Sequence, residues 1–219
     1  EDSRASVTAT PLCAAPGQYY EYSDLGADML GFTVEAVTGE KLDAFLDRRV
    51  FEPLGMTDTH FRPDASLRGR IAPTELTPPR GYPLRGEVHD ENAFTIGGVS
   101  GHAGLFSTAP DLAAFSQMLL NGGSYSHERI LRRATVTQFT SPQQLSSGTR
   151  TLGWAVPTEG GSSGHFFSAH SFGHTGFTGT SIWIDPARDL FVVLLTNRVN
   201  PPRENPKILK LRPALHAPV

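Results

Sequence analysis

The chain has 219 residues, of which 38% are apolar and 19% are charged, and its formal net charge is −3. This composition is typical of a folded globular protein and excludes fibrous, collagen-like and wholly disordered classes. No apolar run approaches the roughly 20 residues that cross a membrane. The weak negative charge argues against nucleic-acid binding, which needs a concentrated basic face. A single cysteine, Cys13, excludes an internal disulfide.

The first predicted helix begins at Ser23 or Asp24, which are good N-cap residues, and ends at Gly39. A second helix is predicted from Leu42 until Pro53 and Gly55 end it. The apolar positions that give the first helix its helical spacing are Leu25, Met29, Leu30, Val34 and Val37.

Residues 62–92 are rich in Pro, Gly and Arg and indicate a long irregular loop, of a length that often carries function. The next helix is predicted to begin after Thr108, with Pro110 and Asp111 in its first turn, and to end at Gly122. A weaker helix is predicted over residues 132–139.

Strand-like patterns then cover residues 151–156, 171–184 and 190–196, and the turn 185–189 joins the last two as a hairpin. The segment 206–215 is weakly helical, and we expect Pro213 to interrupt it. Helices that precede an antiparallel sheet favour an α+β fold. We expect one domain over residues 1–219, with a helical and loop region at about 20–145 and a sheet region at about 151–219.

Two local patterns suggest chemistry that their surroundings do not support. Residues 160–164 match the G-x-S-x-G nucleophile elbow, but no helical pattern follows them, so we interpret them as a flexible loop. His165, His170 and His174 could hold zinc if the fold brought them together. However, Gly164 and Gly173 break any helix that would align them, and no carboxylate lies at a familiar ligand spacing. We therefore predict no metal and no cofactor.

Two short motifs remain, Tyr22-Ser23-Asp24 at a helix start and His174-Thr175-Gly176 in the predicted sheet. With the segments 51–56, 101–108 and 173–180, they closely resemble the serine β-lactamase-like superfamily, in its class C β-lactamase, D-Ala-D-Ala peptidase and esterase branch. The resemblance runs from about Pro11 to Asn200. It implies a β-lactamase/transpeptidase-like fold and a small-molecule or peptidoglycan-like substrate.

The resemblance also assigns roles to single residues. It implies that Tyr22 handles the proton of the nucleophile, beside Asp24, and that His174, Thr175 and Gly176 line the site. The backbone N–H of Phe177 would be one oxyanion donor. Tyr22 and His174 should then lie close together across a cleft. His89 and His102, in Gly-rich surroundings, are candidates for substrate contact, although packed surface loops are an equal alternative.

The chain departs from the family pattern in three ways. It contains no S-x-x-K, so we expect an upstream segment to carry the nucleophile and this chain alone to be inactive. Asp24 stands where Asn is usual. An Asn amide can donate to a substrate carbonyl, whereas an ionised Asp only accepts hydrogen bonds, so this departure favours ester substrates over amide-bearing β-lactams or peptides. His174 stands where Lys is usual and is not a permanent cation.

The sequence therefore predicts a serine acyl hydrolase that works through an acyl-enzyme on an ester, a D-amino-acid peptide or a β-lactam. A non-catalytic binding or regulatory descendant of the same fold is the main alternative, and a zinc hydrolase is a lesser one. The resemblance favours a periplasmic or secreted protein, because members of this kind are often exported. The oligomeric state is left open.

Overall fold

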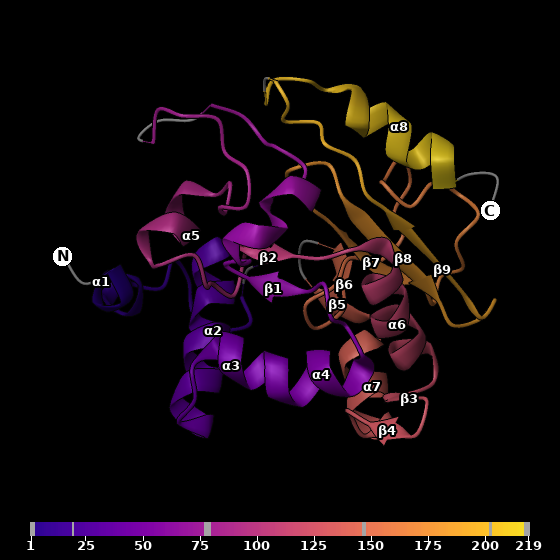
Figure 1. Ribbon diagram of the computed structural model, residues 1–219. Helices are drawn as coiled ribbons and strands as arrows, with labels where there is room; N and C mark the ends of the chain where they lie inside the picture. Colours follow the sequence, from indigo (N-terminus) through magenta and orange to yellow (C-terminus); the bar gives the residue numbers. More distant parts are fainter. Residues whose placement is uncertain (1–2, 19, 77–79, 146–147, 202, 217–219) are drawn as a thin grey trace. The chain divides into compact units, whose positions relative to one another are not determined.

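The computed structural model divides after Thr108: the residues Glu1–Thr108 pack among themselves, and so do Ala109–Val219 (Figure 1). We call these the first and the second unit. The structure describes residues 3–18, 20–76, 80–145, 148–201 and 203–216. Among them, no helix is both long and apolar enough to span a bilayer. Helices and antiparallel strands occur together, so the predicted α+β class is confirmed.

Helix α2 (Asp24–Thr38) carries the first motif at its start. Ser23 has an extended backbone, and its Oγ accepts a hydrogen bond from the Gly26 amide at 3.2 Å. At the other end, Gly39 has a φ of 73° and donates its N–H to the Glu35 carbonyl. Both predicted helix ends are confirmed, because each cap satisfies backbone groups that the helix leaves unbonded.

The second predicted helix is also confirmed. It consists of α3 (Leu42–Leu46), a π-helical turn (Asp47–Phe51) and α4 (Glu52–Leu54), and Gly55 ends it with a φ of 68°. Its buried side chains Leu42, Phe51 and Leu54 belong to the core of the first unit.

Helix α1 (Ser3–Ala9) was not predicted, because its short sequence has no apolar stripe. Arg4 joins it to α2 through an ion pair with Glu35 at 2.7 Å and by lying over the Phe32 ring, with 4.6 Å between the guanidinium carbon and the ring centroid.

In the described part of the predicted irregular loop at residues 62–92, a 3₁₀ turn at Ala65–Arg70 is the helical structure that precedes α5 (Glu91–Thr95). Strands β1 (His60–Phe61) and β2 (Leu105–Phe106) pair antiparallel and so bring together the two ends of the segment 62–104. These two-residue strands are too short to give a pattern in the sequence.

Gly101 lies directly against α2. A Cβ atom built at this position would be 1.9 Å from the Ala27 carbonyl oxygen, far inside any allowed contact. Only glycine therefore lets the segment between α5 and β2 approach the helix so closely.

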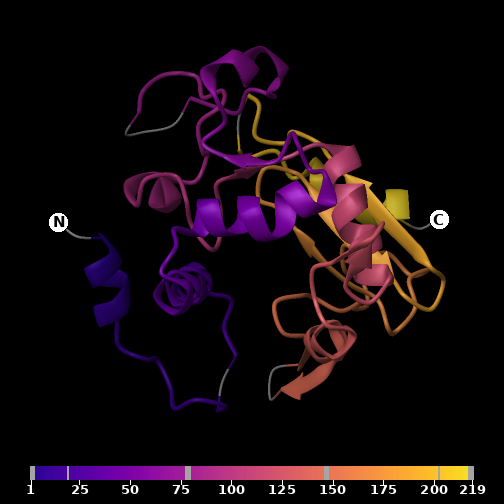
Figure 2. The same ribbon diagram turned by 60° about the horizontal axis from the view of Figure 1, so that its bottom comes forward.

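The second unit is built on a three-stranded antiparallel sheet in the order β7 (Phe172–Thr175), β8 (Ser181–Asp185) and β9 (Leu190–Leu194). The sheet lies between α6 (Ala109–Leu120) and α8 (Lys207–His216), as Figures 1 and 2 show. Its core contains the almost completely buried side chains Met118, Phe172, Trp183 and Ile184.

Two strand predictions in this unit are wrong. Residues 171–184 form two strands rather than one, because the chain reverses at residues 176–180, where Gly179 has a φ of 117°. Residues 151–156 form no strand; Ala155 alone pairs, exchanging backbone hydrogen bonds of 2.8 and 3.0 Å with Gly173. The predicted hairpin between β8 and β9 is confirmed.

The helices of the second unit largely follow the predictions. Helix α6 begins one residue after Thr108, and Gly122 has a φ of 67° just beyond its end. Helix α7 (Arg133–Thr140) lies within one residue of its predicted range. Because α6 packs on β8 and β9, the division between the units falls inside the predicted helical region. The hairpins β3 (Ser124–Tyr125) with β4 (Glu128–Arg129) and β5 (Gln143–Leu145) with β6 (Gly148–Arg150) were not predicted.

The predicted interruption at Pro213 is wrong, because α8 continues through this residue. A proline removes one helical hydrogen bond. The buried side chains Ile208, Arg212 and His216 recur every four residues along one face and hold the last turn of the helix in place.

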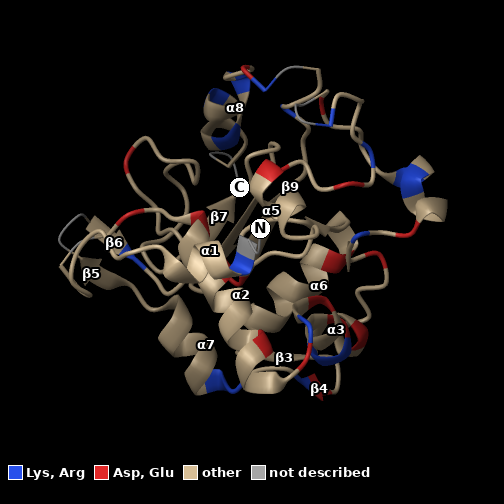
Figure 3. Ribbon diagram, turned by 90° about the vertical axis from the view of Figure 1, so that its left-hand side faces the viewer, with Lys and Arg blue, Asp and Glu red and all other residues tan. Residues whose placement is uncertain are grey.

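Charge differs between the two units (Figure 3). Residues 1–108 contain 16 acidic and 9 basic side chains, whereas residues 109–219 contain 6 acidic and 10 basic ones.

Candidate active site

Tyr22 lies just before the N-cap of α2, and its side chain is 62% exposed. The cap bond of Ser23 fixes the direction of the backbone at this point. Asp24 is the first residue of the helix, where the positive end of the helix dipole favours negative charge. The motif therefore presents a phenol and a carboxylate at one helix end.

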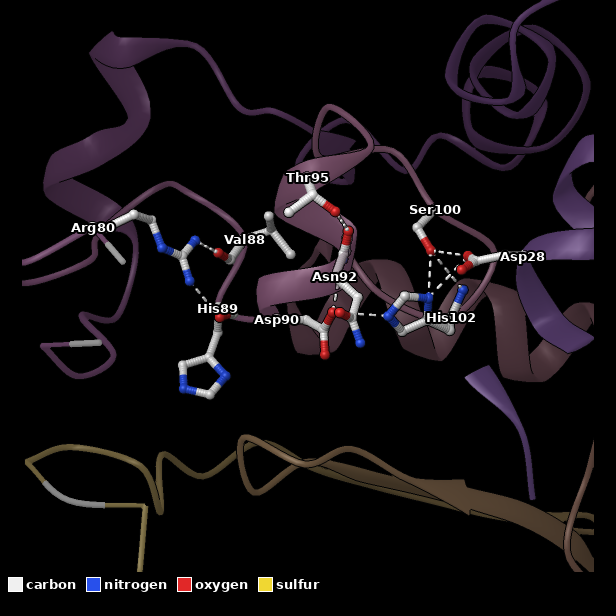
Figure 4. Close-up of polar contacts among 10 residues, drawn as sticks. Asp28, Arg80, Val88, His89, Asp90, Asn92, Thr95, Ser100 and His102 are labelled. Carbon is white, nitrogen blue, oxygen red and sulfur yellow. Dashed lines mark hydrogen bonds and ion pairs between the residues drawn. The ribbon is translucent and has the colours of Figure 1, made fainter. Parts of the chain in front are cut away.

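Behind this motif lies a buried network centred on His102, which Figure 4 shows between Asp28 and Asp90. Its Nδ1 is 2.9 Å from Asp28 Oδ1 and 2.6 Å from Ser100 Oγ, and its Nε2 is 2.8 Å from Asp90 Oδ1. Ser100 Oγ also donates to Asp28. Asp90 in turn caps α5 by accepting from the Ala93 amide at 2.8 Å. One imidazole thus joins α2, α5 and the Gly-rich segment that precedes β2.

The geometry indicates that His102 is protonated on both nitrogens. Ser100 gives its one hydroxyl hydrogen to Asp28, so His102 Nδ1 is the donor in its own contact with Ser100 Oγ. The Asp90 carboxylate accepts from Nε2. Burial by itself lowers the pKa of His102, but the hydrogen bonds to Asp28 and Asp90 outweigh burial and raise the pKa above its usual value. The Asp90 carboxyl responds in the opposite direction: burial raises its pKa, but its bonds to the Ala93 amide and to His102 lower it overall.

Asp24, Asp90 and His102 are the described residues that could take a metal ion, because one ligand atom of each lies within 4.8 Å of the others. A His102 ring that donates from both nitrogens has no lone pair for a metal. A cation could bind here only in exchange for the Nε2 proton. The present arrangement is that of a salt-bridged imidazolium.

Sequence reasoning found His102 but missed its partners Asp28 and Ser100. Asp28 is 3% exposed and lies four residues after Asp24, on the same face of α2. The spacing of these two carboxylates, one turn apart on α2, was the available signal.

His89 lies in a separate buried pair, with 2.7 Å between its Nε2 and Glu75 Oε1. The Arg80 guanidinium donates to the backbone carbonyls of Val88 and His89 (Figure 4). It also lies over the Phe94 ring. The imidazoles of His89 and His102 are both buried and bound to carboxylates. These contacts favour the packed alternative, and contact with substrate stays a prediction.

In the second unit, His174 and Thr175 are the last residues of β7, and Gly176 begins the turn that follows. His174 Nδ1 donates to the Thr175 carbonyl at 2.9 Å, because a carbonyl can only accept. Burial, with a smaller contribution from Arg150, lowers the pKa of His174. The ring is therefore neutral at neutral pH, with Nε2 as its basic nitrogen.

Gly176 and Phe177 occupy the turn between β7 and β8. A Cβ atom at Gly176 would lie 2.2 Å from Thr180 Oγ1, so a larger residue here would force the Thr180 hydroxyl to rotate away. Phe177 lies outside the β7–β8 ladder, and its exposed ring faces the Arg198 guanidinium at 4.2 Å from the ring centroid. Its role as an oxyanion donor stays a prediction.

The two weak patterns lead to no site in the part of the chain that the structure describes. Residues 160–164 form turns with no helix after them, which confirms the loop interpretation. His165, His170 and His174 form no group of ligand atoms there. Tyr22 belongs to the first unit and His174 to the second, and their proximity stays a prediction.

Comparison with known sequences gives relatives for almost the whole chain. A protein of Escherichia coli K12 named "Putative D-alanyl-D-alanine carboxypeptidase" is 40% identical over 220 residues, which are 92% of this chain and 50% of that protein. A protein of the same name from Salmonella typhi is 39% identical over the same shares. The chain spans about half the length of the curated relatives it matches.

Solved structures show the same fold. A β-lactamase from Mycobacterium bovis has a TM-score of 0.64 and 25% identity, and the match covers 93% of this chain and 64% of that one. Simvastatin synthase from Aspergillus terreus has a TM-score of 0.72 at 20% identity, covering 96% and 57%. The family model described as Beta-lactamase matches residues 1–215 and so includes both motifs and both units. The chain belongs to the β-lactamase family of serine hydrolases.

Proposed function

We propose that this chain carries two of the three motifs of a serine acyl hydrolase. The observation that supports this most is the family match over residues 1–215, which contains Tyr22-Ser23-Asp24 at the start of α2 and His174-Thr175-Gly176 at the end of β7. Because the chain has no S-x-x-K, we propose that the nucleophilic serine and its lysine come from outside these 219 residues. The chain alone is then inactive.

In this proposal, Tyr22 takes the proton of the serine hydroxyl as the serine oxygen attacks the substrate carbonyl. The Phe177 N–H donates to the oxygen that becomes negative, and the leaving group takes the proton from Tyr22 as it departs to give an acyl-enzyme. Water then attacks the acyl carbon and gives a proton to Tyr22, which passes it to the serine oxygen as the acid is released. His174, through its basic Nε2, accepts a hydrogen bond in the site.

We further propose that uncharged esters are preferred over substrates that carry a carboxylate. The neutral state of His174 supports this, because the second motif then supplies no permanent cation. Asp24 adds a group that repels a carboxylate when it is ionised. D-Ala-D-Ala peptides are the second candidate, and the name of the 40% identical relative favours them.

The nucleophile is tested by fluorophosphonate labelling. We expect no labelling of the 219-residue chain and labelling of one S-x-x-K serine in the product of the complete open reading frame. In that product, Tyr22→Phe should slow acylation by p-nitrophenyl acetate about 10²–10⁴-fold, whereas Tyr125→Phe in β3 should not. Labelling of a serine within this chain would show that the nucleophile is misassigned. An intact protein that is neither labelled nor active would support the non-catalytic alternative.

The substrate class is tested by the pH dependence of kcat/KM between pH 5 and 8. For esters such as p-nitrophenyl butyrate, kcat/KM should not fall as His174 loses its proton. A chromogenic cephalosporin and a D-Ala-D-Ala peptide, which carry carboxylates, should be poor substrates. Their kcat/KM should fall further as pH rises and His174 loses its proton. A D-Ala-D-Ala peptide turned over faster than every ester would establish the second candidate instead.

A further inference from the structure

All five carbonyl oxygens of the turn at residues 176–180 accept hydrogen bonds. Two arginines and one threonine from outside the turn supply the side-chain donors. Arg212 Nη2 donates to the carbonyls of Gly176 and Thr180, each at 2.7 Å. Arg198 donates from its Nε to the Phe177 carbonyl and from its backbone amide to the Thr178 carbonyl. Thr196 Oγ1 donates to the Gly179 carbonyl at 2.6 Å.

Arg212 is the buried member of this set. It projects from α8, is 6% exposed, and bonds the two ends of the turn through one nitrogen. No carboxylate of the described residues forms an ion pair with it, and the nearby charge that acts on it is Arg198. Burial, with a smaller effect of Arg198, lowers the pKa of Arg212. A buried guanidinium without a carboxylate is costly, so the carbonyls of this turn are its compensating partners.

The peptide between Gly176 and Phe177 has a direction fixed by these contacts. Its carbonyl accepts from the Gly179 amide at 3.1 Å inside the turn and from Arg212. The peptide is trans, so its N–H, which belongs to Phe177, points opposite to its C=O. The Phe177 N–H is therefore aimed away from Arg212 and away from the turn interior.

We infer that Arg212 is a positioning residue for acyl transfer. It does not touch the substrate; it holds the Gly176 carbonyl so that the Phe177 N–H stays aimed at the developing oxyanion. Arg198 restrains the next peptide by bonding the Phe177 carbonyl while stacking on the Phe177 ring. This inference rests on the proposed function, which assigns the Phe177 N–H to the oxyanion.

The geometric half of the inference is tested on the 219-residue chain by amide NMR. Arg212→Lys and Arg212→Met should shift the Phe177 and Gly179 resonances and speed hydrogen exchange across residues 176–180. Lys210→Ala, an exposed cation of the same helix, is the matched control and should leave them unchanged. If Arg212→Met does not fold, Arg212→Lys keeps the charge and one donor and still reports. An unchanged turn in a folded variant overturns the inference.

The catalytic half is tested on the product of the complete open reading frame with p-nitrophenyl acetate. Arg212→Lys should lower kcat about 10–100-fold with little change in KM, since losing a donor entirely costs roughly 10²–10³-fold. Guanidinium added to Arg212→Ala should restore part of the rate, and Lys210→Ala should keep the full rate. A disturbed turn with unchanged kcat, or a rise in KM confined to carboxylate substrates, overturns the positioning role. If the unmutated protein is inactive, the proposed function itself fails and the positioning role fails with it.

Discussion

In the first unit, the residues behind Tyr22-Ser23-Asp24 are joined by side chains: one buried imidazolium lies between Asp28 and Asp90. In the second unit, the residues around His174-Thr175-Gly176 are held by a strand ladder and by arginines bonded to backbone carbonyls. The first arrangement depends on a proton that histidine loses near neutral pH. The second depends on guanidinium groups that stay charged across the same range. The two motifs should therefore respond differently to pH.

The largest effect should come from breaking the contact that brings the His102 segment against α2. Gly101→Ala places a Cβ atom 1.9 Å from the Ala27 carbonyl oxygen, so the free energy of unfolding should fall by at least about 3 kcal/mol. Urea denaturation followed by circular dichroism measures this. Gly69→Ala, where a Cβ atom meets nothing within 4 Å, is the control, and it should stay within about 0.5 kcal/mol of the parent. Equal losses in both variants would contradict the close approach.

The second unit should lose stability in acid through Asp185. Burial raises the pKa of this carboxyl, but bonds from Ser168, Arg188 and the Ala187 amide outweigh burial and lower the pKa to about 2. Its stabilisation is complete above the unfolded pKa of 3.8 and is lost as pH falls through about 2. Asp185→Asn should cost about 2–3 kcal/mol at pH 7 and progressively less below pH 4.

The control for this experiment is Asp189→Asn at the other end of the same turn. Asp189 is exposed, and its φ of 49° suits asparagine equally well. Denaturation midpoints from pH 2 to 7 should separate the two variants. A constant difference between Asp185→Asn and the parent over that range would show that the charge of Asp185 is not the cause.

The first unit should lose stability in base through His102. Because the folded pKa of His102 is raised, its stabilisation is complete below the unfolded pKa of about 6.5 and is lost as pH rises through the folded value. We expect His102→Gln to remove this pH-dependent stability and the exposed-site variant His127→Gln to keep it. Ring NMR of His102 measures the pKa directly, and a value at or below that of free histidine would refute the imidazolium.

The smallest effect should come from the surface contact between α1 and α2. Arg4→Ala removes a partly exposed ion pair and a stacking contact, so it should cost about 0.5–1 kcal/mol. Arg4→Lys, which retains the charge, should recover part of the loss. Amide hydrogen exchange should become faster in α1 and stay unchanged in the sheet. Faster exchange in β7–β9 would mean that α1 stabilises the sheet as well as α2, which contradicts a purely local contact.

The sequence predicted those parts of the fold in which short-range chemistry decides the structure. The Ser23 and Gly39 caps bound α2, and the turn at residues 185–189 bounds the β8–β9 hairpin, because a cap or turn is satisfied by its own neighbours. The two motifs were found in the same way. Each is a few adjacent residues, and the family resemblance that they carry is confirmed.

The tertiary structure decided what depends on partners far away in the chain. Asp28 meets His102 across 74 positions, and Arg212 reaches the carbonyls of the β7–β8 turn from 32 and 36 positions away. Helix α8 persists through Pro213 because tertiary packing buries one of its faces, which no local rule for proline anticipates. Local sequence could name the residues that bear the chemistry, but the burial and pairing that set their protonation and direction arise only when distant segments pack together.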